Sequence, residues 1–120
     1  MTELKIRVEN LPDFFTAAHA AAKKMDAGDF SASTPSLSFE SAEQLFATLS
    51  GNRWALLTKL RETGPSSIRA LAQALSRDYR GVHADVARLM DVGLVEKDQT
   101  GRILVPWSKI TAEVVLEAVA

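Results

Sequence analysis

Three helical segments followed by a hairpin, between residues 53 and 105, constrain the fold of this 120-residue chain most strongly. Apolar residues recur at helical spacing over 53–62, 67–75 and 79–92. After Gly93 the pattern changes to two short extended runs, 94–97 and 102–105, around an Asp-Gln-Thr-Gly turn, which predicts a β-hairpin. Such a mixture of helices and strands places the chain in the α+β class.

The helical spacing also predicts which side chains are buried. They are Trp54, Leu57 and Leu60 in the first helix, Ile68, Leu71, Ala72 and Leu75 in the second, and Val82, Val86 and Leu89 in the third. Gly64-Pro65 separates the first two helices. Either Ser76 or Asp78 caps the start of the third helix, and Gly93 suits its end.

The first forty residues predict a β-α-β extension. Residues 4–9 alternate between apolar and charged, as in a half-buried strand, and 37–40 form a second short strand. Pro12 suits the first turn of a helix between them, and 28–36 is rich in turn-forming residues. One face of that helix is apolar, with Phe14, Ala18, Ala21, Ala22 and Met25.

Two further segments complete the predicted organisation. Ser41 and Gln44 have the spacing of a capping box and open a helix that carries Leu45, Phe46 and Leu49. The C-terminal tail fits both a strand and a helix, with the strand preferred, because Ile110 and Val114 suit either period. The expected division is an extension over 1–40, a central domain over 41–106, and a tail over 107–120 that packs on the core or on a dimer partner.

The central segment resembles a winged helix-turn-helix. Residues 68–75 resemble its scaffold helix, residues 82–89 resemble its recognition helix, and Asp91-Val92-Gly93-Leu94-Val95 resembles the exit into the wing in MarR-, ArsR- and Lrp-like regulators. The chain is similar to small prokaryotic MarR-like regulators, some of which are antitoxin components. The resemblance covers about residues 50–106 and implies a DNA-binding transcriptional regulator. The alternative is an antitoxin-type interaction module that neutralises a toxin protein and binds DNA weakly or only for autoregulation.

The predicted interface with double-stranded DNA comprises polar, basic and aromatic residues at helix starts, in the turn and on the wing. They are Ser66, Ser67, Arg69, Arg77, Tyr79, Arg80, His83, Arg88, Lys97, Thr100 and Arg102. Four of these have plain structural alternatives, because Arg102 shares the alternative of Lys97. Arg80 is otherwise a solvated side chain, His83 an exposed or capping residue, and Lys97 part of a charge-balanced hairpin. Trp54 and Trp107 are expected in the core, and His19 is expected to be structural or on the surface.

Charge and composition exclude several other function classes. Residues 53–102 carry nine basic and six acidic side chains, a net charge of +3, whereas 1–52 carry four and seven, a net charge of −3. The chain has no cysteine, no phosphate-binding loop and no nucleophile or zinc-protease motif, so we expect no enzymatic activity, metal or cofactor. No apolar run reaches the length of a membrane span, so we expect no transmembrane helix. The absence of cysteine fits a protein of the reducing cytoplasm.

A homodimer is the expected assembly, because a single winged helix binds only half of a two-fold symmetric site. The strands of the extension and the tail would have unpaired edges on their own. We therefore expect them to pair, either within the chain or across a two-fold axis. The acidic extension is also compatible with binding a toxin protein.

Overall fold

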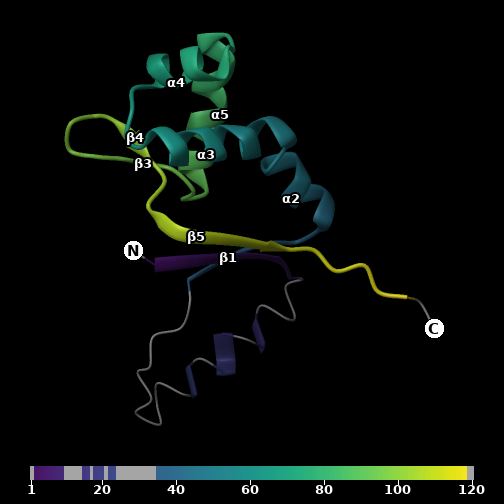
Figure 1. Cartoon of the computed structure of the whole chain (residues 1–120). Coiled ribbons are helices and arrows are strands. Elements are labelled where there is room, and N and C mark those ends of the chain that lie inside the picture. The colour runs from purple at the N-terminus through teal and green to yellow at the C-terminus, as the bar shows by residue number, and fades with distance from the viewer. Residues whose placement is uncertain (1, 10–14, 17, 21, 24–34, 119–120) are drawn as a thin grey trace. The chain divides into compact units, whose positions relative to one another are not determined.

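The computed structural model describes residues 2–9, 15–16, 18–20, 22–23 and 35–118 (Figure 1). The described elements are β1 (Thr2–Val8), β2 (Ser36–Phe39), α2 (Ala42–Thr48), α3 (Gly51–Thr63), α4 (Ile68–Leu75), α5 (Tyr79–Asp91), β3 (Glu96–Lys97), β4 (Ile103–Leu104) and β5 (Trp107–Glu113). The α+β class is confirmed. The chain divides into two compact units. Residues 46–107 form the helical unit, and residues 2–45 together with 108–120 form the sheet unit. None of the helices in these described stretches is long and apolar enough to cross a membrane.

The unit of residues 46–107 has the element order expected from the sequence, α3, α4, α5 and then the β3–β4 hairpin. Of the ten predicted core residues, Ile68 and Leu75 are only half-buried. Seven are buried: Leu57, Leu60, Leu71, Ala72, Val82, Val86 and Leu89. Leu94, Val95, Ile103 and Val105 from the hairpin segment also belong to this core. The hairpin strands themselves are shorter than predicted, and they pair Glu96 with Leu104 and Lys97 with Ile103.

The prediction that Trp54 is buried is wrong, because its side chain is 43% exposed. The buried stripe of α3 contains Leu56, Leu57 and Leu60. Arg53, one turn before Leu57, occupies the inward position at the start of the helix and is half-buried in an ion pair. Trp54 therefore lies at the edge of the stripe, where part of its ring meets solvent.

The end of α5 positions the hairpin. Gly93 has φ of 83°, and its amide donates to the Met90 carbonyl while the Leu94 amide donates to the Leu89 carbonyl. This pair of bonds is a Schellman motif, which ends the helix and turns Leu94 back into the core. The half-buried Trp107 donates its indole N–H to the Gly93 carbonyl at 2.9 Å and ties the chain after the hairpin to the same turn.

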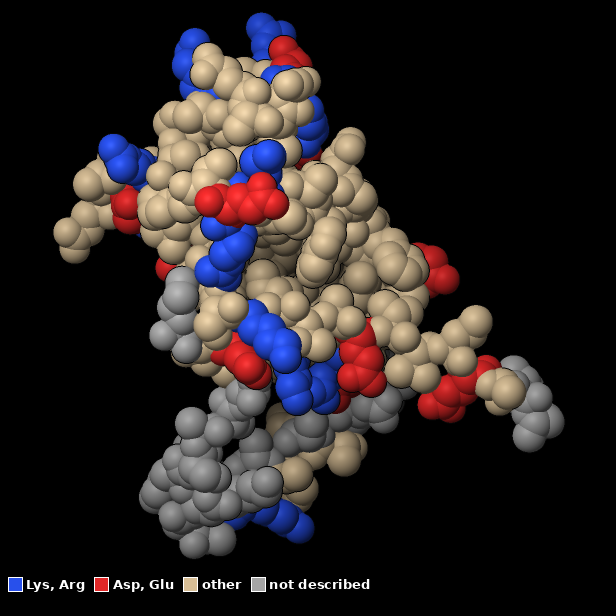
Figure 2. Space-filling model, in the orientation of Figure 1, with Lys and Arg blue, Asp and Glu red and all other residues tan. Residues whose placement is uncertain are grey.

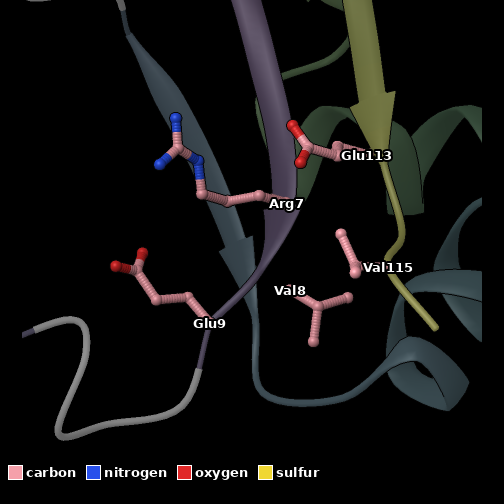
Figure 3. A pocket seen from close by; sticks show the side chains of 5 residues that line it. All are labelled: Arg7, Val8, Glu9, Glu113 and Val115. Carbon is pink, nitrogen blue, oxygen red and sulfur yellow. The ribbon is translucent and has the colours of Figure 1, made fainter. Parts of the chain in front are cut away.

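The second unit contains a three-stranded sheet in the order β2-β1-β5. β1 pairs with β2 in parallel, with Ile6 opposite Leu37 and Val8 opposite Phe39. The strand preference for the tail is confirmed, and β5 pairs with β1 of the same chain rather than remaining a separate segment. Figure 3 shows that β1 and β5 run in the same direction, so the sheet is parallel throughout.

Buried side chains of this unit include Leu4, Ile6, Phe39 and Leu45. Ser41 accepts the Gln44 amide at 3.1 Å, which confirms the Ser half of the predicted capping box. Phe46, which is predicted to lie with Leu45 on the helix that the capping box opens, is 58% exposed. Of the predicted N-terminal helix, 15–16, 18–20 and 22–23 are helical, while Pro12, Phe14, Ala21, Met25 and residues 28–34 of the predicted loop lie outside the described residues. Ser36, the last residue of that predicted loop, begins β2.

Candidate nucleic-acid interface

The start of α4 is fixed to the hairpin by backbone bonds. The Ser66 amide donates to the Ile103 carbonyl at 3.0 Å, and the Ile103 amide donates to the Ser66 carbonyl at 2.8 Å. The Ser66 hydroxyl donates to the Ser67 carbonyl, and Ser67 caps α4 by accepting the Ala70 amide at 3.1 Å. Ser66 and Ser67 therefore shape this end of α4, because both hydroxyl groups already have backbone partners.

The turn between α4 and α5 contains a strained backbone position that the sequence did not reveal. Ser76 ends α4 in the left-handed region, with φ of 53° and ψ of 42°. Its amide donates to the Gln73 carbonyl, and the Arg77 amide donates to the Ala72 carbonyl. Asp78, the second of the two predicted caps, is the residue that caps α5 by accepting the Arg80 amide at 3.1 Å.

The first turn of α5 presents an exposed polar face. Tyr79, Arg80 and His83 are all exposed, while Val82 on the opposite side is fully buried. The Arg69 guanidinium lies 5.5 Å from the centroid of the Tyr79 ring, within cation–π range. The Tyr79 and His83 rings have centroids 5.8 Å apart and an interplanar angle of 45°. These contacts join α4 to the start of α5 and fix the Tyr79 ring.

Arg77 has a different environment, because its guanidinium is held inside the unit. Nη2 of Arg77 donates to Asp85 Oδ2 at 2.8 Å, and Nε of Arg53 donates to Asp85 Oδ1 at 3.1 Å. Arg53 also donates to the carbonyl oxygens of Ala47 and Thr48 at the end of α2. Asp85 thus joins α3, the turn and α5. The Arg77 side chain, which we predicted at the DNA interface, is instead held in an ion pair within the unit.

Arg88 lies two turns further along α5 than Arg80 and is exposed. Its Nη2 donates to the Thr48 hydroxyl at 3.5 Å, which is a long hydrogen bond. This contact directs the side chain toward the end of α2. Arg88 is therefore not grouped with Tyr79 and His83 at the start of the helix.

The tip of the hairpin is organised by Asp98. Its Oδ1 accepts the Thr100 hydroxyl at 2.6 Å and the backbone amides of Thr100 and Arg102. The hydrogen bond from the Thr100 side chain is the main reason that the pKa of Asp98 lies below its ordinary value of 3.8. Gly101, with φ of 86°, closes the turn. Lys97 and Arg102 are exposed on the two sides of this tip, and the Thr100 hydroxyl is already bonded to Asp98.

The eleven predicted residues thus fall into three groups. The structure brings together Arg69, Tyr79, Arg80 and His83 on α4 and α5, and it brings Lys97, Thr100 and Arg102 together on the hairpin. Figure 2 shows Lys and Arg side chains over both regions. The remaining four residues, Ser66, Ser67, Arg77 and Arg88, make contacts within the unit. Sequence reasoning missed Asp85 and Arg53. The one indication of their role in the sequence is that each is a charged residue at a helix position that faces inward.

The sheet unit has a hollow of about 460 Å³ lined by Arg7, Val8, Glu9, Glu113 and Val115 (Figure 3). It opens where β1 and β5 end, which is where parallel sheets commonly bind ligands. Its lining carries one cation and two carboxylates, and Glu9 accepts the Ser38 hydroxyl at 3.1 Å. Among the described residues no group of three or more His, Asp or Glu side chains has the arrangement of a metal site. The exposed start of α5 is the stronger candidate site.

A family model described as HVO_A0114 matches residues 48–112. The chain belongs to the HVO_A0114 family. The match extends from the last residue of α2 into β5, so it contains all eleven predicted residues. No curated protein and no solved structure matches the chain.

Proposed function

We propose that this HVO_A0114-family chain is a transcriptional regulator that binds operator DNA as a homodimer. In this proposal α3, α4, α5 and the β3–β4 hairpin form a MarR-like winged helix-turn-helix, with α5 as the recognition helix and the hairpin as the wing. The observation that carries the proposal is the polar start of α5. Tyr79, Arg80 and His83 are exposed there, on a helix whose opposite face is buried.

Arg80 is the principal contact in this proposal. Its guanidinium has no hydrogen-bond or ion-pair partner among the described residues, and its backbone amide is fixed by Asp78 at the helix cap. An arginine in the first turn of a recognition helix reaches guanine O6 and N7 or a phosphate oxygen. Tyr79, held by Arg69 and His83, would contact a phosphate or a thymine methyl group.

Close approach of α5 to DNA is favoured by small residues on the same turn. Gly81 and Ala84 add little steric bulk, but they have no polar group with which to recognise a base. Arg80 therefore carries most of the base recognition in this arrangement. A large share of the affinity would come from phosphates, whose contribution depends on salt.

The hairpin supplies the second contact. Lys97 and Arg102 are exposed beside a tip whose shape is fixed by the bonds to Asp98. The Ser66–Ile103 bridge joins this hairpin to the start of α4, so the helical part and the wing would dock on DNA as one body. Lysine and arginine on a wing contact the phosphate backbone or the minor groove.

Fluorescence anisotropy with a duplex from the region upstream of the chain's own gene tests the proposal. We expect salt-sensitive binding, because each phosphate contact contributes about −0.9 to the slope of log K against log salt. Arg80→Ala should weaken binding roughly 5- to 150-fold if it removes a base contact, and Lys97→Ala should reduce the salt slope by about one. Lys5→Ala, which removes an exposed lysine in the other unit, is the control. Binding that neither Arg80→Ala nor Lys97→Ala changes would overturn the proposal.

A second candidate function is the neutralisation of a toxin protein. The exposed apolar residues after β5 favour it, with Val114 40%, Val115 61% and Leu116 99% exposed. An apolar run of this kind is a protein contact more often than a nucleic-acid contact. Copurification with the product of the neighbouring gene, combined with no binding to the upstream duplex, would select this function over DNA binding.

A further inference from the structure

The outer edge of β5 has no strand beside it. In the order β2-β1-β5, β5 pairs on one side with β1, and the described residues provide no partner for its other side. β5 is seven residues long, and six of its positions, from Ser108 to Glu113, belong to the sheet unit. An edge of this length leaves a row of backbone N–H and C=O groups free to pair with a further strand.

The side chains of β5 are complementary to themselves in one antiparallel register. Lys109 lies two residues before Thr111 and Glu113 lies two residues after it. If two copies of β5 pair antiparallel with Thr111 opposite Thr111, Lys109 of each copy lies opposite Glu113 of the other. Opposite charges and threonine pairs are both favourable cross-strand neighbours, whereas like charges placed opposite each other are destabilising.

The two charged residues are free to make these pairs. Lys109 and Glu113 are exposed, and neither has an ion-pair partner within the described part of the chain. The same register places the half-buried Ile110 opposite Ala112 on the other face of the strand. It also places the exposed Val114 opposite Ser108, so part of the apolar surface that follows β5 would be covered.

We infer that two copies of this chain associate through antiparallel pairing of their β5 edges, with Lys109 opposite Glu113 and the two-fold axis at Thr111. Two three-stranded sheets become one continuous six-stranded sheet. The interface is isologous, because each copy contributes the same edge. This inference deepens the proposed function, because it names the interface of the homodimer on which that function rests. The dimer forms without DNA, so measurements of association in the absence of DNA test the interface, and measurements of binding to the duplex test the DNA-binding function.

Charge reversal tests the register. Lys109→Glu and Glu113→Lys each place two like-charged pairs across the axis, and each should raise the dimer dissociation constant roughly 10- to 100-fold in sedimentation velocity. Mixing the two variants should restore a dimer, because in the mixed pair both contacts again join opposite charges. The double variant Lys109→Glu with Glu113→Lys should also dimerise. Lys5→Glu, on the central strand β1, is the matched control and should leave the dimer unchanged.

A cysteine cross-link tests the position of the axis. Residues opposite each other in an antiparallel pair have Cα atoms about 4.5–5.5 Å apart, which a disulfide can span. Since the chain has no cysteine, Thr111→Cys should give a covalent dimer under mild oxidation. Ser108→Cys should not, because the two positions would lie about 20 Å apart. A monomeric wild-type protein at micromolar concentration, single reversals that dimerise as well as wild type, or cross-linking at 108 in place of 111 would each overturn the inference.

Discussion

Asp85 is the residue whose removal should destabilise the helical unit most among the exposed or half-buried positions. Its carboxylate accepts from Arg77 at 2.8 Å and from Arg53 at 3.1 Å, and its side chain is only 14% exposed. The arginine side chains are 27% and 22% exposed, so both guanidinium groups are largely removed from water. Nη1 of Arg77 is buried and has no hydrogen-bond partner, so loss of the Nη2 bond to Asp85 would leave the whole guanidinium without a counter-charge.

The magnitude follows from these contacts. A charge-assisted hydrogen bond contributes about 1.5–3 kcal/mol, so the two bonds together are worth about 3–6 kcal/mol before correction. Arg53 keeps its bonds to the carbonyl oxygens of Ala47 and Thr48, and water reaches part of each arginine. We therefore expect Asp85→Ala to lower the free energy of unfolding by about 3 kcal/mol. For a unit of this size the midpoint temperature should fall by roughly 10–20 °C.

Urea unfolding followed by circular dichroism measures this change. Asp91→Ala, on the same helix but exposed and without an ion-pair partner in the described residues, is the matched control and should change stability by less than about 0.5 kcal/mol. A double-mutant cycle with Arg77→Ala should give a coupling free energy of about 1–3 kcal/mol. If Asp85→Ala cost no more than the control, the two ion pairs would contribute nothing to the stability of the fold.

Three smaller effects follow from caps and turns. Ser67→Ala should cost about 1 kcal/mol in urea unfolding, because it removes the cap of α4. Gly93→Ala should cost about 1 kcal/mol or more because φ is 83°, whereas Gly51→Ala, at a glycine without positive φ, should not. The pKa of Asp98 is lower in the folded chain than its ordinary value of 3.8, so the ionised carboxylate stabilises the hairpin turn. This stabilisation is complete above pH 3.8 and is lost as the pH falls through the pKa of Asp98 in the folded chain. The amide resonances of Thr100 should report that loss, and a tip that keeps its bonds throughout acidification would contradict it.

Periodicity predicted most of the helical unit because its core depends on local spacing. Val82, Val86 and Leu89 are spaced by four and three residues, so they share one face of α5 wherever the helix begins and ends. Their burial could therefore be predicted without knowledge of the neighbouring elements. Gly93 was likewise identified by a local requirement for positive φ. The strand preference for the tail had a weaker basis, and pairing with β1 decides it in favour of β5.

The errors arose where tertiary contacts decide the environment of a residue. Trp54 has the residue type of a core position, but Arg53 takes the inward place because Asp85, more than thirty residues later, provides its counter-charge. Arg77 is basic and lies in the turn before α5, so sequence alone groups it with DNA contacts. Its ion pair with Asp85 depends on how α5 packs, which single-sequence periodicity does not contain.

Gly81 provides a final test that separates a role in folding from a role in binding. It lies inside α5, where alanine is more favourable than glycine by about 0.8–1 kcal/mol. A Cβ at this position would meet only Arg77 Nη2, at 3.5 Å, which is an ordinary contact. Gly81→Ala should therefore raise the free energy of unfolding by about 0.5–1 kcal/mol. If α5 enters a DNA groove at this turn, the same methyl group should weaken DNA binding. A variant that gains stability and binds the upstream duplex as tightly as wild type would show that close approach at Gly81 is not part of recognition.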